Sequence, residues 1–346
     1  MMRLSANLTA AATCVIVSSV VCQSTLGREV KLTIYPQKAS ATAGKWSLLP
    51  PEASLIDGDA APLYDKAVKA LPPEPDRNQG SKWLAMPVAK LPLEKVQGVL
   101  ERDMAGLKGV ARAVRCRECN WPKLTDAAAL NAHFEELRRL RVLVQLWARY
   151  EIAQGNHEGA ILAMRTGFGM ARHVAPAPNT LQFTLGVLMA GSMCREVEPF
   201  VQTEDAPNLY AALAALPRPF VDVEKAIEDD KKATPSELPP GVKMTREQIE
   251  SEWKASHDQQ RLLAKGLERD LSVLQCIEAI RSYAASHGGQ LPQTLADITE
   301  VSVPKDPING AVFRYTRTGS TAVLESPAPP GGNERDAVRY EIIVKN

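Results

Sequence analysis

A chain of 346 residues is long enough for about two domains of ordinary size. Its 41 lysines and arginines balance 40 aspartates and glutamates, and the resulting net charge of +1 gives no field that would attract nucleic acid or anionic lipid. Aromatic residues make up only 5% of the chain and long helical periodicities dominate it, so we expect a mainly α protein.

The N-terminus has the pattern of a secretory signal peptide. Arg3 precedes a largely apolar run over 8–21, which is too short to span a membrane but suits the apolar part of such a signal. We predict a signal peptide over 1–23 and an exported protein of the periplasm or cell envelope; retention of the signal as an anchor stays an open alternative. Val21 before Cys22 fits a lipoprotein signal poorly, so no lipid anchor is expected. No later segment is long and apolar enough to cross a membrane, so no transmembrane segment is expected in the mature chain.

Residues 24–60 predict an extended lead-in, in which the β-like piece 30–35 can add one strand to a sheet elsewhere. Residues 61–235 predict a helical domain. In its longest predicted helix, the periodicity turns Leu137 and Val144 inward and leaves open whether Leu140 or Arg141 does so. The principal helices of this domain are expected at 62–71, 93–115, 126–154, 157–174, 181–202 and 222–232.

The helices over 126–154 and 157–174 are typical of a tetratricopeptide-like hairpin. Ala148, Gly155-Asn156 and Ala160 keep the spacing of small residue, turn and small residue that lets two helices touch. The rest of that consensus is missing, and no second copy follows at the matching period. We therefore expect a helical bundle with one repeat-like hairpin instead of a repeat array.

Residues 236–346 predict a small α+β module that follows a proline-rich boundary segment. A long helix over 245–286 has a polar, exposed first half, and from Leu263 onward apolar residues recur every three or four positions. His287-Gly288-Gly289 is a helix stop of the left-handed glycine type. About three antiparallel strands are then expected, from the strand-like runs at 312–317, 321–325 and 338–344.

This C-terminal module resembles the globular part of the major pseudopilin of type II secretion systems. The resemblance is carried by the long helix, the turn Gly289–Pro292, Asp306-Pro-x-x-Gly310, Phe313-x-Tyr315 and the hairpin turn Thr318–Ser320. It implies a pilin-like fold that serves as a cap or docking surface. The methylated apolar helix that drives pilus assembly in that family has no counterpart before Leu263. The family's calcium loop is replaced by the proline-rich segment 326–336, so no calcium is expected although Glu334 and Asp336 are hard oxygen ligands in principle.

A second resemblance covers most of the chain. It is carried by the pilin-like module together with Cys119-Asn-Trp121, Arg138–Trp147, Gly167–His173, Pro207–Tyr210 and Ala214–Pro219. These segments resemble a group of exported planctomycete proteins. The resemblance implies an architecture and an exported location, and it implies no activity.

Cys116-x-x-Cys119 is the sharpest local motif, and it is open to three interpretations: a structural disulfide, a redox pair or half of a zinc site. A redox pair normally lies at a helix N-terminus, whereas this pair is predicted at the C-terminal end of the helix over 93–115, where the helix dipole disfavours a thiolate. No second Cys or His pair completes a zinc site. We therefore favour structural cysteines. With Cys194 and Cys276, three disulfide pairings stay open.

The remaining candidates predict neither a catalytic site nor a cofactor. The five histidines share no metal-binding spacing, so no metal site is predicted. Arg172, His173 and Arg218 either line a groove or hold helix ends and pair with carboxylates. We predict a non-enzymatic binding or scaffold protein of the cell envelope whose partner is another envelope protein. The alternative is a hydrolase-type enzyme whose acid, base or nucleophile residues are dispersed over the helical domain and converge in one pocket.

Overall fold

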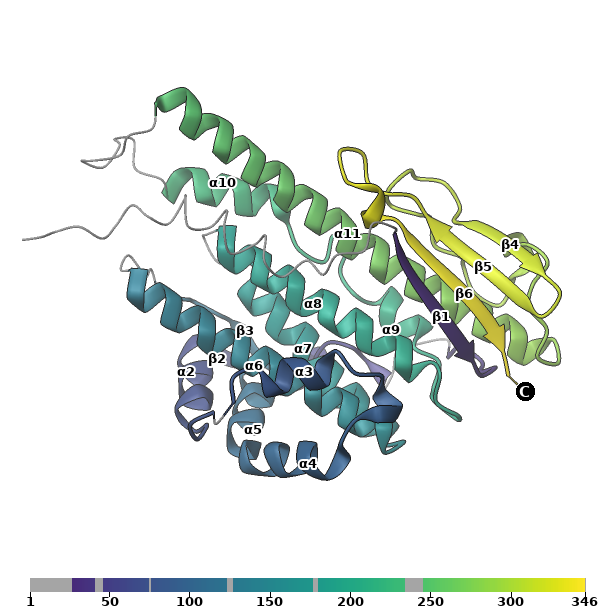
Figure 1. Ribbon diagram of the computed structural model, residues 1–346, viewed down its shortest axis with the longest axis horizontal. Helices are drawn as coiled ribbons and strands as arrows, with labels where there is room; N and C mark the ends of the chain where they lie inside the picture. Colours follow the sequence, from purple (N-terminus) through teal and green to yellow (C-terminus); the bar gives the residue numbers. More distant parts are fainter. Residues whose placement is uncertain are drawn as a thin grey trace, which may run out of the picture.

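Helices dominate the architecture (Figure 1). The computed structural model describes residues 27–40, 46–74, 76–122, 127–176, 180–233 and 245–345. Within these ranges the protein is 57% helix, with ten helices and a small mixed sheet of four strands. The helices are α2 (Ala61–Lys69), α3 (Gln79–Leu84), α4 (Leu93–Arg102), α5 (Met104–Ala113), α6 (Ala127–Ala153), α7 (His157–Val174), α8 (Thr180–Phe200), α9 (Tyr210–Ala214), α10 (Val223–Ala233) and α11 (Arg246–Ser286). The strands are β1 (Arg28–Ile34), β2 (Ile56–Asp59), β3 (Cys116–Glu118), β4 (Arg314–Thr318), β5 (Thr321–Ser326) and β6 (Val338–Val344).

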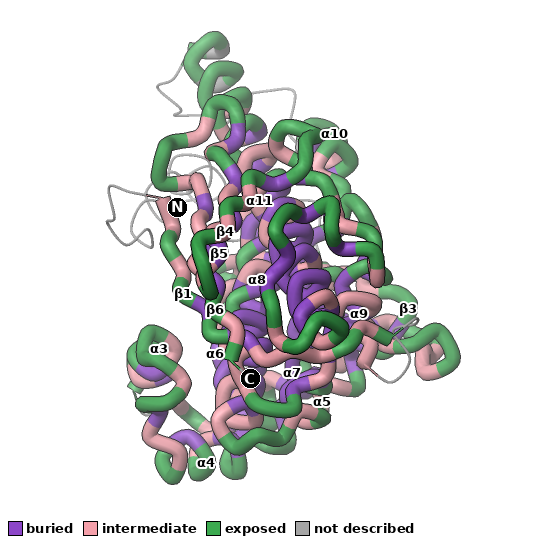
Figure 2. Tube along the Cα trace, turned by 90° about the vertical axis from the view of Figure 1, so that its right-hand side faces the viewer, coloured by how far each residue is buried: buried purple, intermediate pink, exposed green. Residues whose placement is uncertain are grey.

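The helices α6, α7 and α8 pack on one another, and α11 lies along the other side of α8. Gly155 adopts φ +68° in the turn that joins α6 to α7, and the Asn156 side chain caps α7 by accepting a hydrogen bond from Gly159 N at 3.2 Å. Gly186 lets α8 approach α7, because a Cβ there would lie 2.6 Å from the backbone of Ala175. The predicted pair of helices at 126–154 and 157–174 is confirmed, and the buried residues run through its centre (Figure 2).

The single helix predicted over 93–115 is wrong. The chain breaks at Asp103 into α4 and α5, so that α4 packs on α6 while α5 packs on α2. The Asp103 carboxylate is 1% exposed and accepts hydrogen bonds from Arg102 Nε at 2.9 Å and Nη2 at 2.8 Å, and Arg139 of α6 lies 3.8 Å away. The break brings this buried carboxylate to its two arginines, a tertiary gain that the helical periodicity did not indicate. Because α5 ends at Ala113, Cys116 begins a strand and does not end a helix.

The sheet has the order β1-β6-β5-β4, with β4, β5 and β6 antiparallel and β1 parallel to β6. The expected three antiparallel strands are therefore supplemented by a fourth, parallel strand. It comes from the N-terminal lead-in, whose predicted ability to add a strand is confirmed: Arg28 lies opposite Val338 and Ile34 opposite Val344. A second pair, β2 and β3, is parallel and was missed, because each strand is too short to show a period.

The long helix α11 packs its second half against α8 and the sheet. Thr245 caps it through a capping box with Gln248, and Gly288 and Gly289 follow its end with positive φ. Its apolar residues from Leu267 to Ile280 belong to the same buried core as Leu32 of β1 and Tyr340 of β6. None of the described helices is long and apolar enough to cross a membrane.

Candidate functional site

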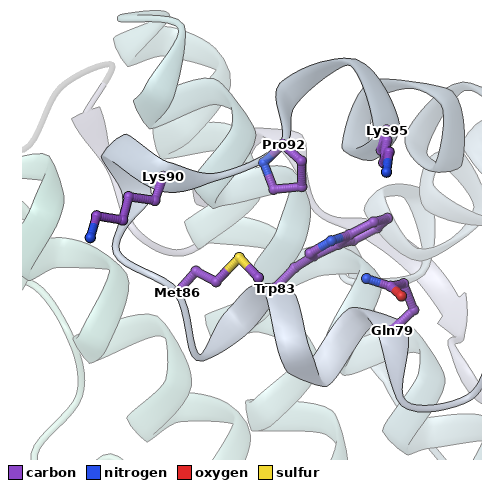
Figure 3. A pocket seen from close by; sticks show the side chains of 6 residues that line it. All are labelled: Gln79, Trp83, Met86, Lys90, Pro92 and Lys95. Carbon is purple, nitrogen blue, oxygen red and sulfur yellow. The ribbon is translucent and has the colours of Figure 1, made fainter.

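A surface hollow of about 550 Å³ lies where α3, the short 3-10 helix Val88–Lys90 and α4 meet (Figure 3). Its floor is apolar, with the buried Trp83 ring at the centre and Met86 and Pro92 beside it. Lys90 and Lys95 flank that ring from opposite sides. The described lining residues are Gln79, Trp83, Met86, Lys90, Pro92 and Lys95, and none of them is a carboxylate.

The floor of this hollow is fixed by Arg149 of α6. Its Nη1 donates to three carbonyls at and just after the end of α3, those of Leu84 at 2.5 Å, Met86 at 2.9 Å and Trp83 at 3.2 Å; the Trp83 carbonyl also accepts from Met86 N at 3.1 Å. Its Nε donates to the buried Glu196 carboxylate of α8 at 3.1 Å. One guanidinium therefore holds α3 and the Trp83 ring on the α6 and α8 surface.

A second hollow of similar volume, about 550 Å³, lies between β2, α5 and α7. Leu162, 43% exposed, and Ile56 supply its apolar surface. The lining consists of Ile56, Lys108, Ala111, Arg112, Arg115 and Leu162. Both hollows thus combine apolar side chains with cations and lack a lining carboxylate.

The cations of the two hollows are largely free to bind a ligand. Among the residues that the structure describes, Lys90, Lys95, Lys108 and Arg112 form no ion pair with a carboxylate. Only Arg115 is engaged, donating from Nε to Ser54 O at 2.8 Å. An acidic ligand would therefore pair with these cations without displacing an existing partner. The apolar lining beside them favours a segment that is both acidic and apolar.

The Cys116-x-x-Cys119 motif, for which structural cysteines were favoured, has one buried and one half-buried thiol. Cys116 is in β3, and Asp59 of β2 holds the chain after Cys119 by accepting a hydrogen bond from Asn120 N at 2.8 Å. All four described cysteines are free thiols. Burial raises the pKa of both the Cys116 and Cys119 thiols, with the charge of Asp59 adding to the effect. A thiolate is disfavoured in both positions, unlike the lowered pKa of a reactive redox cysteine; pairing of the two as a disulfide stays a prediction.

His173, predicted as a groove residue, is enclosed by partners. Tyr64 Oη lies 3.0 Å from its Nδ1, and the Cys116 carbonyl lies 3.1 Å from its Nε2. Because a carbonyl only accepts, Nε2 carries the proton and Nδ1 accepts from the tyrosine. Trp121 stacks on Tyr64 and donates from Nε1 to His173 O at 2.7 Å. This neutral histidine joins α7 to β3 and α2.

Acidification is expected to destabilise the protein partly through His173. Burial lowers the pKa of His173 below its ordinary value of 6.5, so the unfolded chain takes up this proton at a higher pH than the folded chain. The stability from the neutral ring is present above pH 6.5 and is lost as the pH falls from 6.5 toward the folded-state pKa. Urea unfolding at a series of pH values should show that the free energy of unfolding falls less steeply with decreasing pH in His173→Gln than in the unaltered protein. If the variant keeps the same dependence of unfolding free energy on pH, His173 does not contribute to it. Part of this pH dependence should remain in the variant, because burial also lowers the pKa of His133 and His157.

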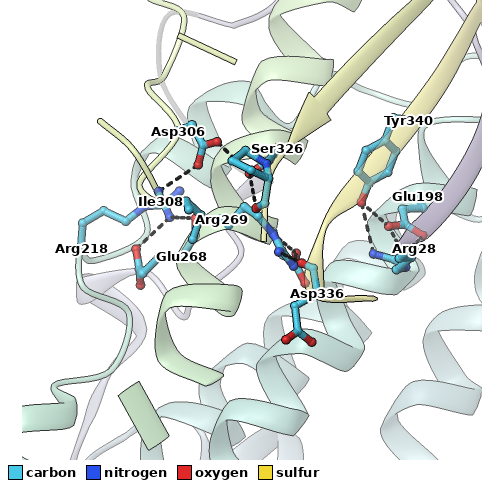
Figure 4. A network of polar contacts seen from close by, with 12 residues as sticks. Arg28, Glu198, Arg218, Glu268, Arg269, Asp306, Ile308, Ser326, Asp336 and Tyr340 are labelled. Atoms are coloured by element: carbon cyan, nitrogen blue, oxygen red, sulfur yellow. Dashed lines mark hydrogen bonds and ion pairs between the residues drawn. The ribbon is translucent and has the colours of Figure 1, made fainter. Parts of the chain in front are cut away.

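Arg172 and Arg218, the other two predicted groove residues, hold one chain segment from two sides. Arg172 Nη1 donates to Phe220 O at 3.3 Å, and Arg218 Nη1 donates to a Glu268 carboxylate oxygen of α11 at 3.1 Å (Figure 4). The same carboxylate accepts a hydrogen bond from Phe220 N at 2.5 Å. The structure therefore brings Arg172 and Arg218 to one segment and places His173 elsewhere, and neither hollow is lined by any of the three.

A further polar network, which sequence reasoning missed, joins the N-terminal strand to the helical part of the protein. Glu198 of α8 accepts a hydrogen bond from Tyr340 Oη of β6 at 2.8 Å and forms an ion pair with Arg28 of β1 (Figure 4). Its pKa is raised by burial, against the opposing charge of Arg28. Arg28 lies 170 positions and Tyr340 lies 142 positions from Glu198 in the sequence, so no local pattern could indicate these contacts.

No protein-family model, no curated protein and no solved structure matches this chain. In the described ranges, no group of three or more His, Cys, Asp or Glu residues is arranged to hold a metal ion.

Proposed function

We propose that the protein is an exported, non-enzymatic binding or scaffold protein of the cell envelope that recognises acidic, partly apolar segments of another envelope protein. The observation that carries the proposal is the shared chemistry of the two hollows. Each has an apolar floor and two or more cations at its rim, and no carboxylate occurs among its described lining residues. The signal-like N-terminus supports the exported location.

The Trp83 hollow is the stronger of the two candidate binding sites. Its aromatic floor would bury an apolar side chain of the partner, and aromatic anchors in pockets contribute most of the binding energy at protein interfaces. Lys90 and Lys95 would pair with carboxylates on both sides of that anchor. Rim charges chiefly raise the rate and specificity of association, so the two lysines would select acidic partners although the whole chain is nearly neutral.

We further propose that α6, α7 and α8 belong to an N-terminal bundle with one tetratricopeptide-like hairpin, and that α11 and the sheet form a pilin-like module used for docking. The contact of α6 with α7 across the Gly155 turn and the Asn156 cap supports the first part. The second is supported by the capped α11, the glycine stop after it and a buried Asp306 that accepts from Ser326 Oγ at 2.7 Å.

Charge reversal tests the proposed function. Met86, 37% exposed at the edge of the Trp83 hollow, is replaced by the photoreactive residue benzoylphenylalanine, and cross-linked partners are identified from envelope fractions. Lys90→Glu/Lys95→Glu in that background is expected to abolish the main adduct, because it repels an acidic segment. A labelled peptide of alternating Glu and Leu is expected to bind the protein with the original lysines and to lose about tenfold or more in affinity for the double variant.

The matched control is Lys66→Glu/Lys69→Glu on α2. These two lysines are also exposed, form no ion pair among the described residues and lie outside both hollows. Their reversal changes the net charge equally and should leave the adduct and the peptide affinity unchanged. Equal losses in both double variants would mean that only overall charge matters, and the proposal would fail.

A further inference from the structure

Two arginines converge on one serine at the interface of α6 and α8. Arg141 Nη1 lies 3.1 Å and Arg195 Nη2 lies 3.2 Å from Ser192 Oγ. The hydroxyl donates its own proton to Leu188 O at 2.8 Å, so the oxygen accepts from both guanidinium groups. Ser192 is fully buried, and this shared acceptor fixes the two like charges side by side.

Among the described residues, neither of these guanidinium groups has a carboxylate within ion-pairing distance. In the part of the chain that the structure describes, neither Arg141 nor Arg195 forms an ion pair, and the neighbouring Arg138 is already paired with Glu74 and Glu135. Burial, with the charges of Arg195 and Arg138, lowers the pKa of Arg141 to about 10. A half-buried cation with one neutral acceptor is costly to maintain.

Two other arginines on the helices α6 and α11 have carboxylate partners. Arg149, two turns farther along α6, binds a carboxylate and three carbonyls, and the fully buried Arg281 binds a carboxylate and two carbonyls. The arrangement around Ser192 therefore differs from those of Arg149 and Arg281, each of which binds a carboxylate.

The unused donors at this arginine pair are accessible. Arg195 is exposed, and the Nε and Nη2 groups of Arg141 have no acceptor within the part of the chain that the structure describes. Among the described residues, only Gln260 has side-chain polar atoms that are both inaccessible to solvent and without a hydrogen-bond partner. The unpartnered Arg141 nitrogens are not among these atoms, so they are in contact with solvent. A ligand can therefore approach both guanidinium groups from outside while Ser192 holds them in place.

We propose that Arg141, Arg195 and Ser192 form a binding site for a tetrahedral oxyanion, namely a phosphate or sulfate group. The planar fork of each arginine matches two oxygens of such a group, and a doubly charged anion neutralises both cations. The Ser192 hydroxyl orients the arginines and does not contact the anion. The site lies on α6 and α8, has no lining residue in common with the two hollows and stands independently of the proposed function.

The test compares thermal unfolding and calorimetric titration in inorganic phosphate, in sulfate and in chloride at equal ionic strength. Phosphate and sulfate are expected to raise the Tm of the unaltered protein relative to chloride. Arg141→Met and Arg195→Met are each expected to weaken the affinity for these anions by about tenfold to a hundredfold, since each removes charge-assisted hydrogen bonds. In chloride, Arg141→Met should melt at the same or a higher temperature, because an uncompensated charge is removed.

Arg335→Met is the matched control, since Arg335 is exposed and forms no ion pair among the described residues. It should keep the full response to phosphate and sulfate. A second arm measures sedimentation of the protein with vesicles of phosphatidylglycerol and with vesicles of phosphatidylcholine. If the protein sediments only with phosphatidylglycerol, if Arg141→Met abolishes this, and if the free ions have no effect, the site is supported and its ligand is a lipid phosphate. The proposal is overturned if neither arm responds, if both methionine variants respond fully, or if Arg335→Met loses the response equally. Because Arg195 is exposed, Arg195→Met keeps the test decisive even if Arg141→Met fails to fold.

Discussion

Arg281→Met is expected to lower the free energy of unfolding by about 3–5 kcal/mol, because it leaves a buried carboxylate without its cation. Arg281 and Glu278 of α11 are both 0% exposed, and the arginine Nη1 donates to the carboxylate at 2.8 Å. Arg281 also donates to Tyr35 O after β1 and to Ala206 O before α9, both at 2.9 Å. One side chain thus joins three segments that are far apart in the chain. Urea unfolding followed by circular dichroism measures the loss.

The pH dependence of this variant separates the lost charge from lost packing. Burial raises the pKa of Glu278 above its ordinary value of 4.5 even beside Arg281, and the substitution should raise it further. A raised carboxyl pKa lets the folded state take up a proton at a higher pH than the unfolded state, so the destabilisation should shrink as the pH falls toward 4.5. Arg281→Met/Glu278→Gln should also recover part of the loss. A deficit that is constant with pH and unchanged in the double variant would contradict the electrostatic explanation.

The exposed Arg314 supplies the control for this comparison. Its side chain is 81% exposed and lies 3.9 Å from Glu325, and such surface pairs contribute roughly 0–1 kcal/mol. Arg314→Met should therefore leave both the unfolding free energy and its pH dependence close to those of the unaltered protein.

Arg149→Met is expected to cost about 3 kcal/mol or more and to dismantle the Trp83 hollow. The substitution leaves the Glu196 carboxylate, 1% exposed, with Gln145 Nε2 at 2.7 Å as its remaining side-chain partner. It also removes the Arg149 donor from the carbonyls of Leu84 and Met86, and from that of Trp83, which keeps Met86 N. In Arg149→Met, amide hydrogen exchange should speed up more in α3 than in α7. The affinity for the acidic peptide should fall together with the protection of α3 from exchange.

Two outcomes distinguish this explanation from general loss of structure. Arg149→Met/Glu196→Gln should recover stability, because the uncompensated carboxylate is gone. It should not restore peptide binding, because the carbonyls of Leu84 and Met86 still lack the Arg149 donor. If the double variant recovers both properties, or if α3 keeps its protection in the single variant, Arg149 does not hold the hollow in the way that its contacts indicate.

Local patterns predicted most helices and strands of this protein. The helix over 157–174 and the strand over 338–344 lie where the sequence placed them, and α11 begins beside Thr245 and ends before Gly288 as expected. These features depend on caps, glycine conformations and apolar periods that act within a few residues. Where a distant contact competes with the local pattern, the prediction fails. The helix over 93–115 breaks because Asp103 gains buried contact with Arg102 and with Arg139 of α6.

The candidate sites were less predictable than the fold. The sequence pattern left open whether Leu140 or Arg141 faces inward; the structure buries Leu140 and half-buries Arg141, and only the approach of α8 shows that Arg195 and Ser192 meet it. The Trp83 hollow likewise depends on Arg149, which lies 66 positions away.

By itself, the sequence determined the mainly helical class, most element bounds and the availability of an N-terminal strand, because short-range steric and hydrophobic preferences encode them. Only the tertiary structure decided that β1 joins β6 in parallel, that His173 faces Tyr64 while Arg172 faces Phe220, and that two arginines share Ser192. Each of these depends on which distant segments pack together. Which segments pack together is decided by burial of the whole core, and this packing produces no hydrophobic period or motif spacing in the sequence.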